Sequence, residues 1–276
     1  MIDTKSVLAY GLEETAVILN RGFSDYFVPI NFTLNSLLNM VAHDGLDLSS
    51  SRIAFKNGEP VGAGLIARRG WSSRLAGMAI VPEAQNQGIG KQFMKVLVTD
   101  AKERGDHRME LEVIAANTPG IKLYESAGFR TMRQLFSYKL ESPPLFQTSN
   151  TAIEIDIREV ARQVTLNGYS DLPWQLSGET IAGFTPPYQA YRLDKAFVVL
   201  TNPENETIHI RSLIVNQSAR NQGQATQLLH SLFTRFPGKT WNVPAIFPEE
   251  LGPLFETLGF KRGELSQWQM ALDIRE

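Results

Sequence analysis

The chain has 276 residues, of which 43% are hydrophobic and 20% charged, and its formal net charge is −2. This near-neutral charge gives no reason to expect nucleic acid or an anionic membrane as a partner. The absence of cysteine excludes disulfides, thiolate metal sites and a cysteine nucleophile. No apolar run reaches the ~18–20 residues that cross a membrane, and the N-terminus has no apolar signal-peptide core, so we expect a cytoplasmic protein.

The first 70 residues predict two helices and then a β-hairpin. Residues 11–26 and 32–45 have the apolar spacing of amphipathic helices. Residues 51–69 hold two apolar runs on either side of Asn57-Gly58, a dipeptide typical of a two-residue hairpin turn.

The next 70 residues alternate between strands and helices. Residues 75–81 form an apolar run before a proline and predict a strand, and residues 91–104 have helical spacing and end at a glycine. Residues 109–114 predict another strand. A helix starts at Thr118-Pro119 and ends near a glycine, and residues 134–140 predict a closing strand.

Two phrases of this first half recur in the second half. QNQGIG at 85–90 returns as RNQGQA at 220–225, and LYESAGF at 123–129 returns as LFETLGF at 254–260. A repeat of this length is too long for a solenoid and favours two domains of one fold. We expect them at residues 1–142 and 151–276, joined by a polar linker with two prolines at 143–150.

The repeated glycine phrase follows a predicted strand and opens a predicted helix. The first N–H groups of a helix are unpaired and partly positive, and they suit a phosphate or pyrophosphate. Gly88 and Gly90 lack a Cβ atom, so the backbone can approach a ligand closely. The phrase is not a Walker loop, and it lacks the third glycine of a dinucleotide fingerprint.

These phrases carry a family resemblance. Residues 85–90, then Asn117, then Tyr124 and the Gly128-Phe129 pair resemble the motifs of the GCN5-related N-acetyltransferase (GNAT) superfamily. The resemblance implies a mixed α/β fold with a strongly bent sheet, present twice in tandem. Its two central strands would part to admit the pantetheine arm of acetyl-CoA.

The resemblance also implies the residues that bind acetyl-CoA. The backbone of two strand residues would pair with pantetheine, the amides of the glycine turn would hold the pyrophosphate, and an asparagine would contact the cofactor arm. These residues are Ile80, Val81, Gln85, Gln87, Gly88, Ile89, Gly90, Lys91, Asn117 and Tyr124.

Acetyl transfer to an amine needs a base, an oxyanion donor and an acid for the leaving thiolate. By its place in the motif, Tyr124 is the expected acid. Glu112 has the spacing seen in ribosomal-protein N-acetyltransferases and is the expected base, through water, with Glu110 as the alternate. The Val81 amide is the expected oxyanion donor. Each also has a structural interpretation, such as core aromatic, solvated strand residue or, for Asn117, helix cap.

The second half lacks these groups. Aligned on Gly-Phe, the positions of Tyr124, Asn117 and Glu112 are held there by Phe255, Pro248 and Val243. We therefore expect the chemistry in the first domain. The second domain would form a wall of the substrate site or an interface, and the sequence leaves open whether it binds CoA.

The predicted function is acetyl-CoA-dependent N-acetyl transfer to a primary amine of a small molecule or peptide. A non-catalytic acyl-CoA sensor and activity in the second domain are the alternatives. The four histidines have no ligand spacing, so no metal is expected. The tandem could be a monomer with an internal pseudo-dimer, or a homodimer.

Overall fold

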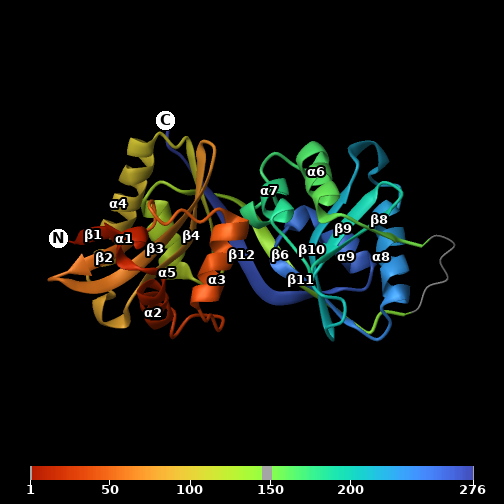
Figure 1. The fold of residues 1–276 in the computed structure, drawn as a ribbon, viewed down its shortest axis with the longest axis horizontal. Helices are drawn as coiled ribbons and strands as arrows, with labels where there is room; N and C mark the ends of the chain where they lie inside the picture. The colour runs from red at the N-terminus through yellow and green to blue at the C-terminus, as the bar shows by residue number, and fades with distance from the viewer. Residues whose placement is uncertain (1, 145–150, 276) are drawn as a thin grey trace. The chain divides into compact units, whose positions relative to one another are not determined.

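A computed structural model describes residues 2–144 and 151–275 (Figure 1). The remainder of the predicted linker, 145–150, lies outside the described residues. The chain forms two compact units. Unit 1 comprises the residues up to Arg133 together with those from Trp268 on, and unit 2 comprises Gln134–Gln267.

Unit 1 is built on a mixed sheet with the strand order β1-β2-β3-β4-β5-β12. The first four strands pair antiparallel, and β4 pairs parallel with β5. The strands of this part of the chain are β1 (Asp3–Ser6), β2 (Arg52–Lys56), β3 (Glu59–Arg69), β4 (Ser72–Ile80), β5 (Arg108–Ile114) and β6 (Arg130–Glu141). The helices are α1 (Val7–Tyr10), α2 (Leu12–Gly22), α3 (Leu34–Asn39), α4 (Ile89–Arg104) and α5 (Thr118–Ser126).

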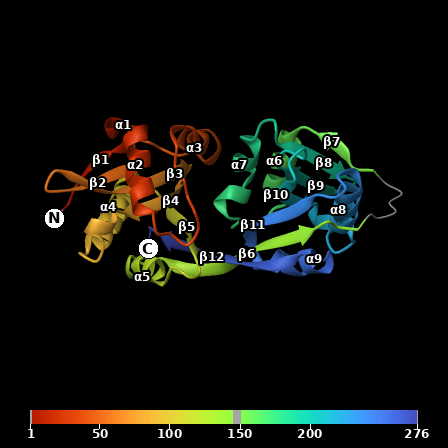
Figure 2. The ribbon, with the colours of Figure 1, turned by 90° about the horizontal axis from the view of Figure 1, so that it is seen from below.

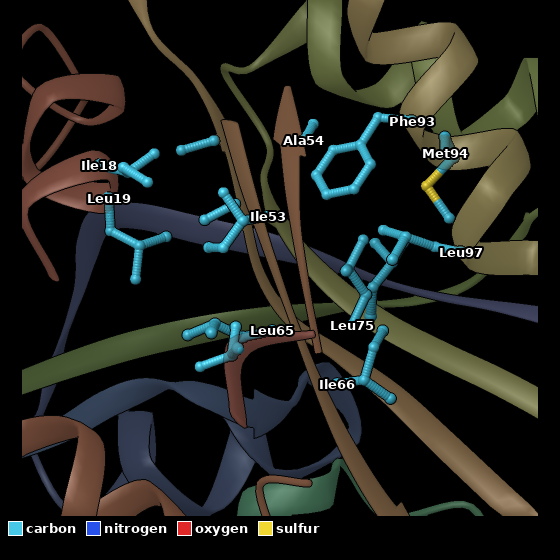
Figure 3. Packing of buried hydrophobic residues seen from close by; sticks show 14 of the residues in the cluster. Ile18, Leu19, Ile53, Ala54, Leu65, Ile66, Leu75, Phe93, Met94 and Leu97 are labelled. Carbon is cyan, nitrogen blue, oxygen red and sulfur yellow. The ribbon is translucent and has the colours of Figure 1, made fainter. Parts of the chain in front are cut away.

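Helices α2 and α4 cover opposite faces of this sheet (Figure 3). Successive strand residues point to opposite faces, so Leu65 packs on the side of α2 and Ile66 on the side of α4. Leu19 of α2 and Phe93 of α4 are both fully buried in the resulting core. Because both faces of β3 are buried, its sequence is a nearly continuous apolar run without the alternation of a half-exposed strand.

Unit 2 repeats this plan with the strand order β12-β6-β11-β10-β9-β8-β7. The pairs from β7 to β10 are antiparallel, β10 pairs parallel with β11, and β11 pairs antiparallel with β6. Its strands are β7 (Ile153–Ile155), β8 (Gln189–Leu193), β9 (Ala196–Leu200), β10 (Thr207–Val215), β11 (Thr240–Pro248) and β12 (Lys261–Asp273). Its helices are α6 (Ile157–Asn167), α7 (Gly178–Ala182), α8 (Gln224–Arg235) and α9 (Gly252–Thr257).

The two faces of the unit 2 sheet are also both covered. Phe197 and Val199 of β9 share a core with α6, whereas Val198 and Leu200 share one with α8. Figure 2 shows α6 and α9 on opposite sides of β10 and β11. The predicted mixed α/β class is confirmed.

The two units exchange strand segments, which chain order did not predict. The expected domains were 1–142 and 151–276, but β6 from Gln134 on belongs to unit 2, and β12 from Trp268 on belongs to unit 1. The physical reason is burial. Met270 is fully buried in the core of unit 1, and Tyr138 is fully buried in that of unit 2.

Several element boundaries differ from the sequence-based ones. The second predicted helix, 32–45, is α-helical only over Leu34–Asn39 and then becomes a π-helical turn over Met40–Asp44. The strand expected from residue 75 begins at Ser72. Among the described residues, no helix is long and apolar enough to cross a membrane.

Replacing Met270 with alanine tests the strand exchange. The side chain is fully buried in unit 1 although it lies near the C-terminus, so its removal leaves a cavity and is expected to lower the unfolding free energy by about 2–5 kcal/mol in urea titrations. Glu264→Ala, an exposed site earlier on the same strand, is the control. A Met270 variant as stable as the parent would contradict this packing.

Candidate functional site

Strands β4 and β5 separate partway along their length. Their paired register runs from Ser72 opposite Arg108 to Leu75 opposite Leu111, and the described ladder ends there although both strands continue. A β-bulge at Ala76 of β4, where the register with β3 shifts, lies at the same point. A bulge bends its strand and increases the local twist. The bulged strand therefore leaves its parallel neighbour and opens a gap in the sheet of unit 1.

Alternation along β4 decides which backbone groups face this gap. The Val81 N–H donates to the Val61 carbonyl oxygen of β3 at 3.0 Å, so Val81 faces away from β5. Alternate residues of an antiparallel strand point their backbone groups to opposite sides. The backbone groups of Met78 and Ile80 consequently face the gap. The expected oxyanion role of the Val81 amide does not fit this geometry, whereas the expected contact of Ile80 does.

The first glycine turn stands at the mouth of the gap. Asn86 and Gly88 have φ values of 58° and 72°, and Gly88 caps α4 without a side-chain hydrogen bond. The Gln85 side-chain amide donates to the Ile80 carbonyl oxygen at 3.0 Å. The Gln87 amide donates to the Glu83 carbonyl oxygen at 2.7 Å. These two side chains fix the turn so that the first N–H groups of α4 stay exposed.

Lysine side chains add positive charge around this turn. The Lys56 ammonium donates to Gln87 Oε1 at 2.6 Å, and Lys91 is exposed in the first turn of α4. A cation is unfavourable at the positive end of a helix dipole, and a bound anion offsets this cost. Of the other predicted residues here, Ile89 points its side chain into the core, and a Cβ atom added at Gly90 would lie 3.6 Å from the Leu123 side chain.

Asn117 and Tyr124 lie together at α5. Asn117 caps the helix, and its Oδ1 accepts a hydrogen bond from the Gly120 N–H at 3.0 Å. The Tyr26 hydroxyl is hydrogen-bonded to the Asn117 side chain, and burial raises the pKa of Tyr26. Burial, together with the neighbouring Tyr26 phenol, raises the pKa of Tyr124 well above its usual value. Tyr124 is therefore a neutral phenol throughout the physiological pH range.

Tyr26 was not among the predicted site residues. It lies between α2 and α3, in a segment held by Asn20, which donates to the Phe32 carbonyl oxygen at 2.8 Å and accepts from the Phe32 N–H at 2.7 Å. Edge-to-face packing of Phe23 on Tyr26, with ring centroids 4.9 Å apart, orients the phenol. The only sequence signal was the concentration of aromatic residues in GFSDYF.

The two carboxylates of β5 are both paired with arginines. Glu112 Oε2 lies 2.7 Å from the Arg74 guanidinium, and the two side chains are only 2% and 9% exposed. Glu110 Oε1 lies 2.7 Å from Arg108, and the Glu110 side chain is 13% exposed. Burial raises the pKa of Glu110. The expected base, Glu112, is thus the more deeply buried and more firmly held carboxylate.

Unit 2 keeps the backbone of this site. The ladder of β10 with β11 ends at His209 opposite Asn242, and a bulge lies at Arg211. In its glycine turn, Asn221 and Gly223 have φ values of 59° and 72°, matching the first turn. The side chains differ. Phe255 and Pro248 stand where unit 1 has Tyr124 and Asn117. The strand registers place Pro244, and not the expected Val243, at the position of Glu112, because one residue fewer separates this strand from the following helix in unit 2.

Comparison with known proteins assigns the first half to a family. Residues 21–129 match the family model described as the acetyltransferase (GNAT) family, and this range contains the gap, the glycine turn and α5. This match identifies residues 21–129 as a GNAT domain.

Solved structures extend the likeness in fold to the whole chain. A GCN5-related N-acetyltransferase from Sphaerobacter thermophilus is 14% identical with a TM-score of 0.72, and the match covers 100% of this chain and 96% of that one. A tandem GNAT protein from the clavulanic acid biosynthesis pathway is 13% identical with a TM-score of 0.66, and the match covers 99% of each chain. At these identities the likeness shows the tandem GNAT fold alone.

Similarity in sequence to curated proteins is short. The ribosomal protein bS18-alanine N-acetyltransferase of Escherichia coli K12 is 40% identical over 55 residues, which are 20% of this chain and 37% of that protein. The match thus spans little more than a third of this relative's length.

The Arg74–Glu112 pair can be tested by a double-mutant cycle. Arg74→Met removes one guanidinium from the buried Glu112 carboxylate and is expected to lower the unfolding free energy by about 3–5 kcal/mol. Adding Glu112→Leu removes the buried charge and is expected to recover most of that loss, as measured by urea unfolding. Strictly additive effects of the two substitutions would show that the residues are not coupled.

Proposed function

We propose that unit 1 transfers an acetyl group from acetyl-CoA to a primary amine of a small molecule or peptide. The observation that carries this proposal is the gap between β4 and β5, with the glycine turn at its mouth and Tyr124 nearby on α5. The match of residues 21–129 to the GNAT family supports it.

The residues of the gap fit a long thioester with a pyrophosphate. The exposed first turn of α4 and Lys91 suit the phosphates, because N–H groups and cations attract negative charge there. The free edge of β4 suits the amides of pantetheine, which can pair with it as an added strand would. When bound, acetyl-CoA would supply the thioester carbonyl that the amine attacks.

The Met78 N–H is the oxyanion donor in this proposal. It faces the gap two residues after the bulge, whereas Val81 donates to Val61. A backbone donor fixed by the sheet stabilises charge as it develops on the carbonyl oxygen, without reorganisation at the moment of reaction. Ile80, with its carbonyl oxygen capped by Gln85, lies next along the same edge and positions the pantetheine.

Tyr124 protonates the leaving sulfur. Its raised pKa keeps the phenol protonated until the C–S bond breaks. The same burial would raise the pKa of the departing thiol, because desolvation disfavours the thiolate. The proton transfer is therefore not opposed by a large difference between the pKa of the phenol and that of the thiol. Asn117 and Tyr26 position the phenol from α5 and from the segment after α2.

Glu110 takes the proton from the amine. Its raised pKa makes it a stronger base than an ordinary carboxylate, and its side chain retains access to solvent. Glu112 would have to leave the Arg74 guanidinium buried without its counter-charge in order to accept a proton, which is costly. The Arg74–Glu112 pair instead sets the electrostatic environment beside the base.

The acceptor amine approaches past the segment that carries Tyr26. Phe27 on this segment and Leu38 on α3 are 52% and 46% exposed, so they offer an apolar surface beside the polar centre. The curated relative is named for acetylating an alanine of a ribosomal protein. A peptide amino group next to a small apolar side chain is accordingly the first acceptor to test.

Replacing Tyr124 with phenylalanine removes the acid while keeping the ring. The proposal expects kcat to fall by about 10²–10⁴-fold and the Kd for acetyl-CoA to change only a few-fold, measured by release of free thiol and by calorimetry. Tyr10→Phe, a tyrosine that packs against Phe55 instead, is the control. Tight acetyl-CoA binding with no turnover in the parent, across a panel of amines, would instead favour a sensor.

The choice between the two carboxylates can be made from pH profiles. Because burial raises the pKa of Glu110, the proton-accepting form is lost as pH falls through that raised pKa, and kcat/KM should fall with it. Glu110→Gln is expected to lower the rate by about 10²-fold or more and to abolish this acidic limb. Glu112→Gln should retain the limb. If Glu112→Gln alone abolished it, the assignment would be reversed.

A further inference from the structure

Unit 2 contains a cavity of about 610 Å³ at the point where β10 and β11 separate. This volume is within the range of sites that hold small organic ligands. The cavity begins at the second glycine turn, where Gly223 and Thr226 line it, and continues along Leu213 and Val215 of β10. It therefore occupies the place in unit 2 that the β4–β5 gap has in unit 1.

The entrance of this cavity suits a phosphate. Gly223 is left-handed and caps α8 without a side-chain hydrogen bond, so the first N–H groups of a 12-residue helix are exposed at the cavity. The guanidinium of Arg220 also lines it, held by the Val215 carbonyl oxygen at 3.4 Å and lying over the Tyr169 ring. Both features favour negative charge at this end.

The far end of the cavity is apolar where the site of unit 1 is polar. Leu172 and Leu176 line it from the segment between α6 and α7, the counterpart of the segment that carries Tyr26. Phe247 of β11 and Leu254 of α9 line it from the other side, and Glu250 is also among the lining residues of the cavity. An alkyl chain would be favourably buried against the leucine and phenylalanine side chains.

The two groups that would move protons in unit 1 are replaced in unit 2. Phe255, which is fully buried, stands at the position of Tyr124, and Asn242 stands at the position of Glu110 in the strand register. Neither side chain can perform the proton transfer assigned to its counterpart. A thioester bound here would not lose its acyl group to an amine by the route proposed for unit 1.

We propose that the cavity of unit 2 binds an acyl-CoA whose acyl chain is longer than acetyl, and holds it without turnover. The phosphates lie on the turn at Gly223, the pantetheine runs along β10, and the alkyl chain fills the space beside Leu172 and Leu176. This binding requires no transfer in unit 1, so it stands or falls independently of the function proposed there.

Calorimetric titration of the full chain with CoA, acetyl-CoA and octanoyl-CoA tests the assignment. Each buried methylene contributes roughly fourfold in affinity, so octanoyl-CoA is expected to bind unit 2 at least ~30-fold more tightly than acetyl-CoA. Thr226→Glu places a carboxylate in the first turn of α8, which favours the helix but repels phosphate, and is expected to abolish the octanoyl-CoA site. Lys91 is the matched position in unit 1, and the Lys91→Glu variant is expected to keep the octanoyl-CoA site of unit 2.

Leu172→Gln tests the apolar end separately, at a partly buried position. It is expected to reduce the preference for octanoyl-CoA over acetyl-CoA by about tenfold or more while the affinity for CoA itself is kept. Unchanged titration of Thr226→Glu, equal binding of octanoyl-CoA and CoA by the parent, or an unaltered chain-length preference in Leu172→Gln would each overturn the proposal.

Discussion

The backbone of β4 beyond Leu75 has no strand partner on its β5 side among the described residues, and the rest of the site depends on this. Buried backbone groups without partners cost about 1–3 kcal/mol each, so an opened strand must be solvated, covered or occupied. The Gln85 amide covers the Ile80 carbonyl oxygen, and the edge beyond it remains a template for a ligand with amides of its own. The bulge at Ala76 maintains the opening, since closing it would require a change in the β3–β4 register.

In the described part of the chain, both units contain a strand edge that has no strand partner beyond a bulge, and different side chains surround it in each. The bulges at Ala76 and Arg211 and the glycine turns at Gly88 and Gly223 lie at matching places in the two units. Backbone geometry of this kind is specified by pairing and turn chemistry, and it survives changes in the residues that line the opening. The function of each opening is therefore decided by the side chains from the flanking segments, such as Tyr26 in unit 1 and Leu172 in unit 2.

Local patterns predicted most of the fold. The Asn57-Gly58 turn, the stop at Gly105 and the strand–turn–helix phrase around Gly88 depend on neighbours in sequence, and the structure has them where expected. Long-range pairing was not predictable in this way. The sequence of β12 becomes more apolar from Trp268 on, but this change does not tell which of the two cores the apolar residues, such as Met270, will join.

The orientation of the site residues could not be predicted from the sequence either. The glycine turn and the positions of Asn117 and Tyr124 follow from motif spacing, but whether Val81 faces the gap depends on the phase of the β3–β4 ladder, which the bulge shifts. Likewise, a glutamate on a strand gives no sign of its partner. Glu112 and Arg74 are 38 residues apart in the sequence, and they meet because β4 and β5 are neighbours in the sheet.

Charge at the floor of the opening distinguishes the two units. A buried ion pair adds little to stability, because desolvation offsets the attraction between its members. The Arg74–Glu112 pair is nevertheless present where β4 and β5 part, next to Glu110. In unit 2 the ladder ends on a neutral contact, with the Asn242 amide 3.0 Å from His209 Nδ1, and burial lowers the pKa of that histidine. A reaction that moves protons and forms an oxyanion benefits from fixed charges around it, whereas retention of an alkyl chain does not. The ion pair therefore supports, independently of Tyr124, the proposal that unit 1 carries out the chemistry.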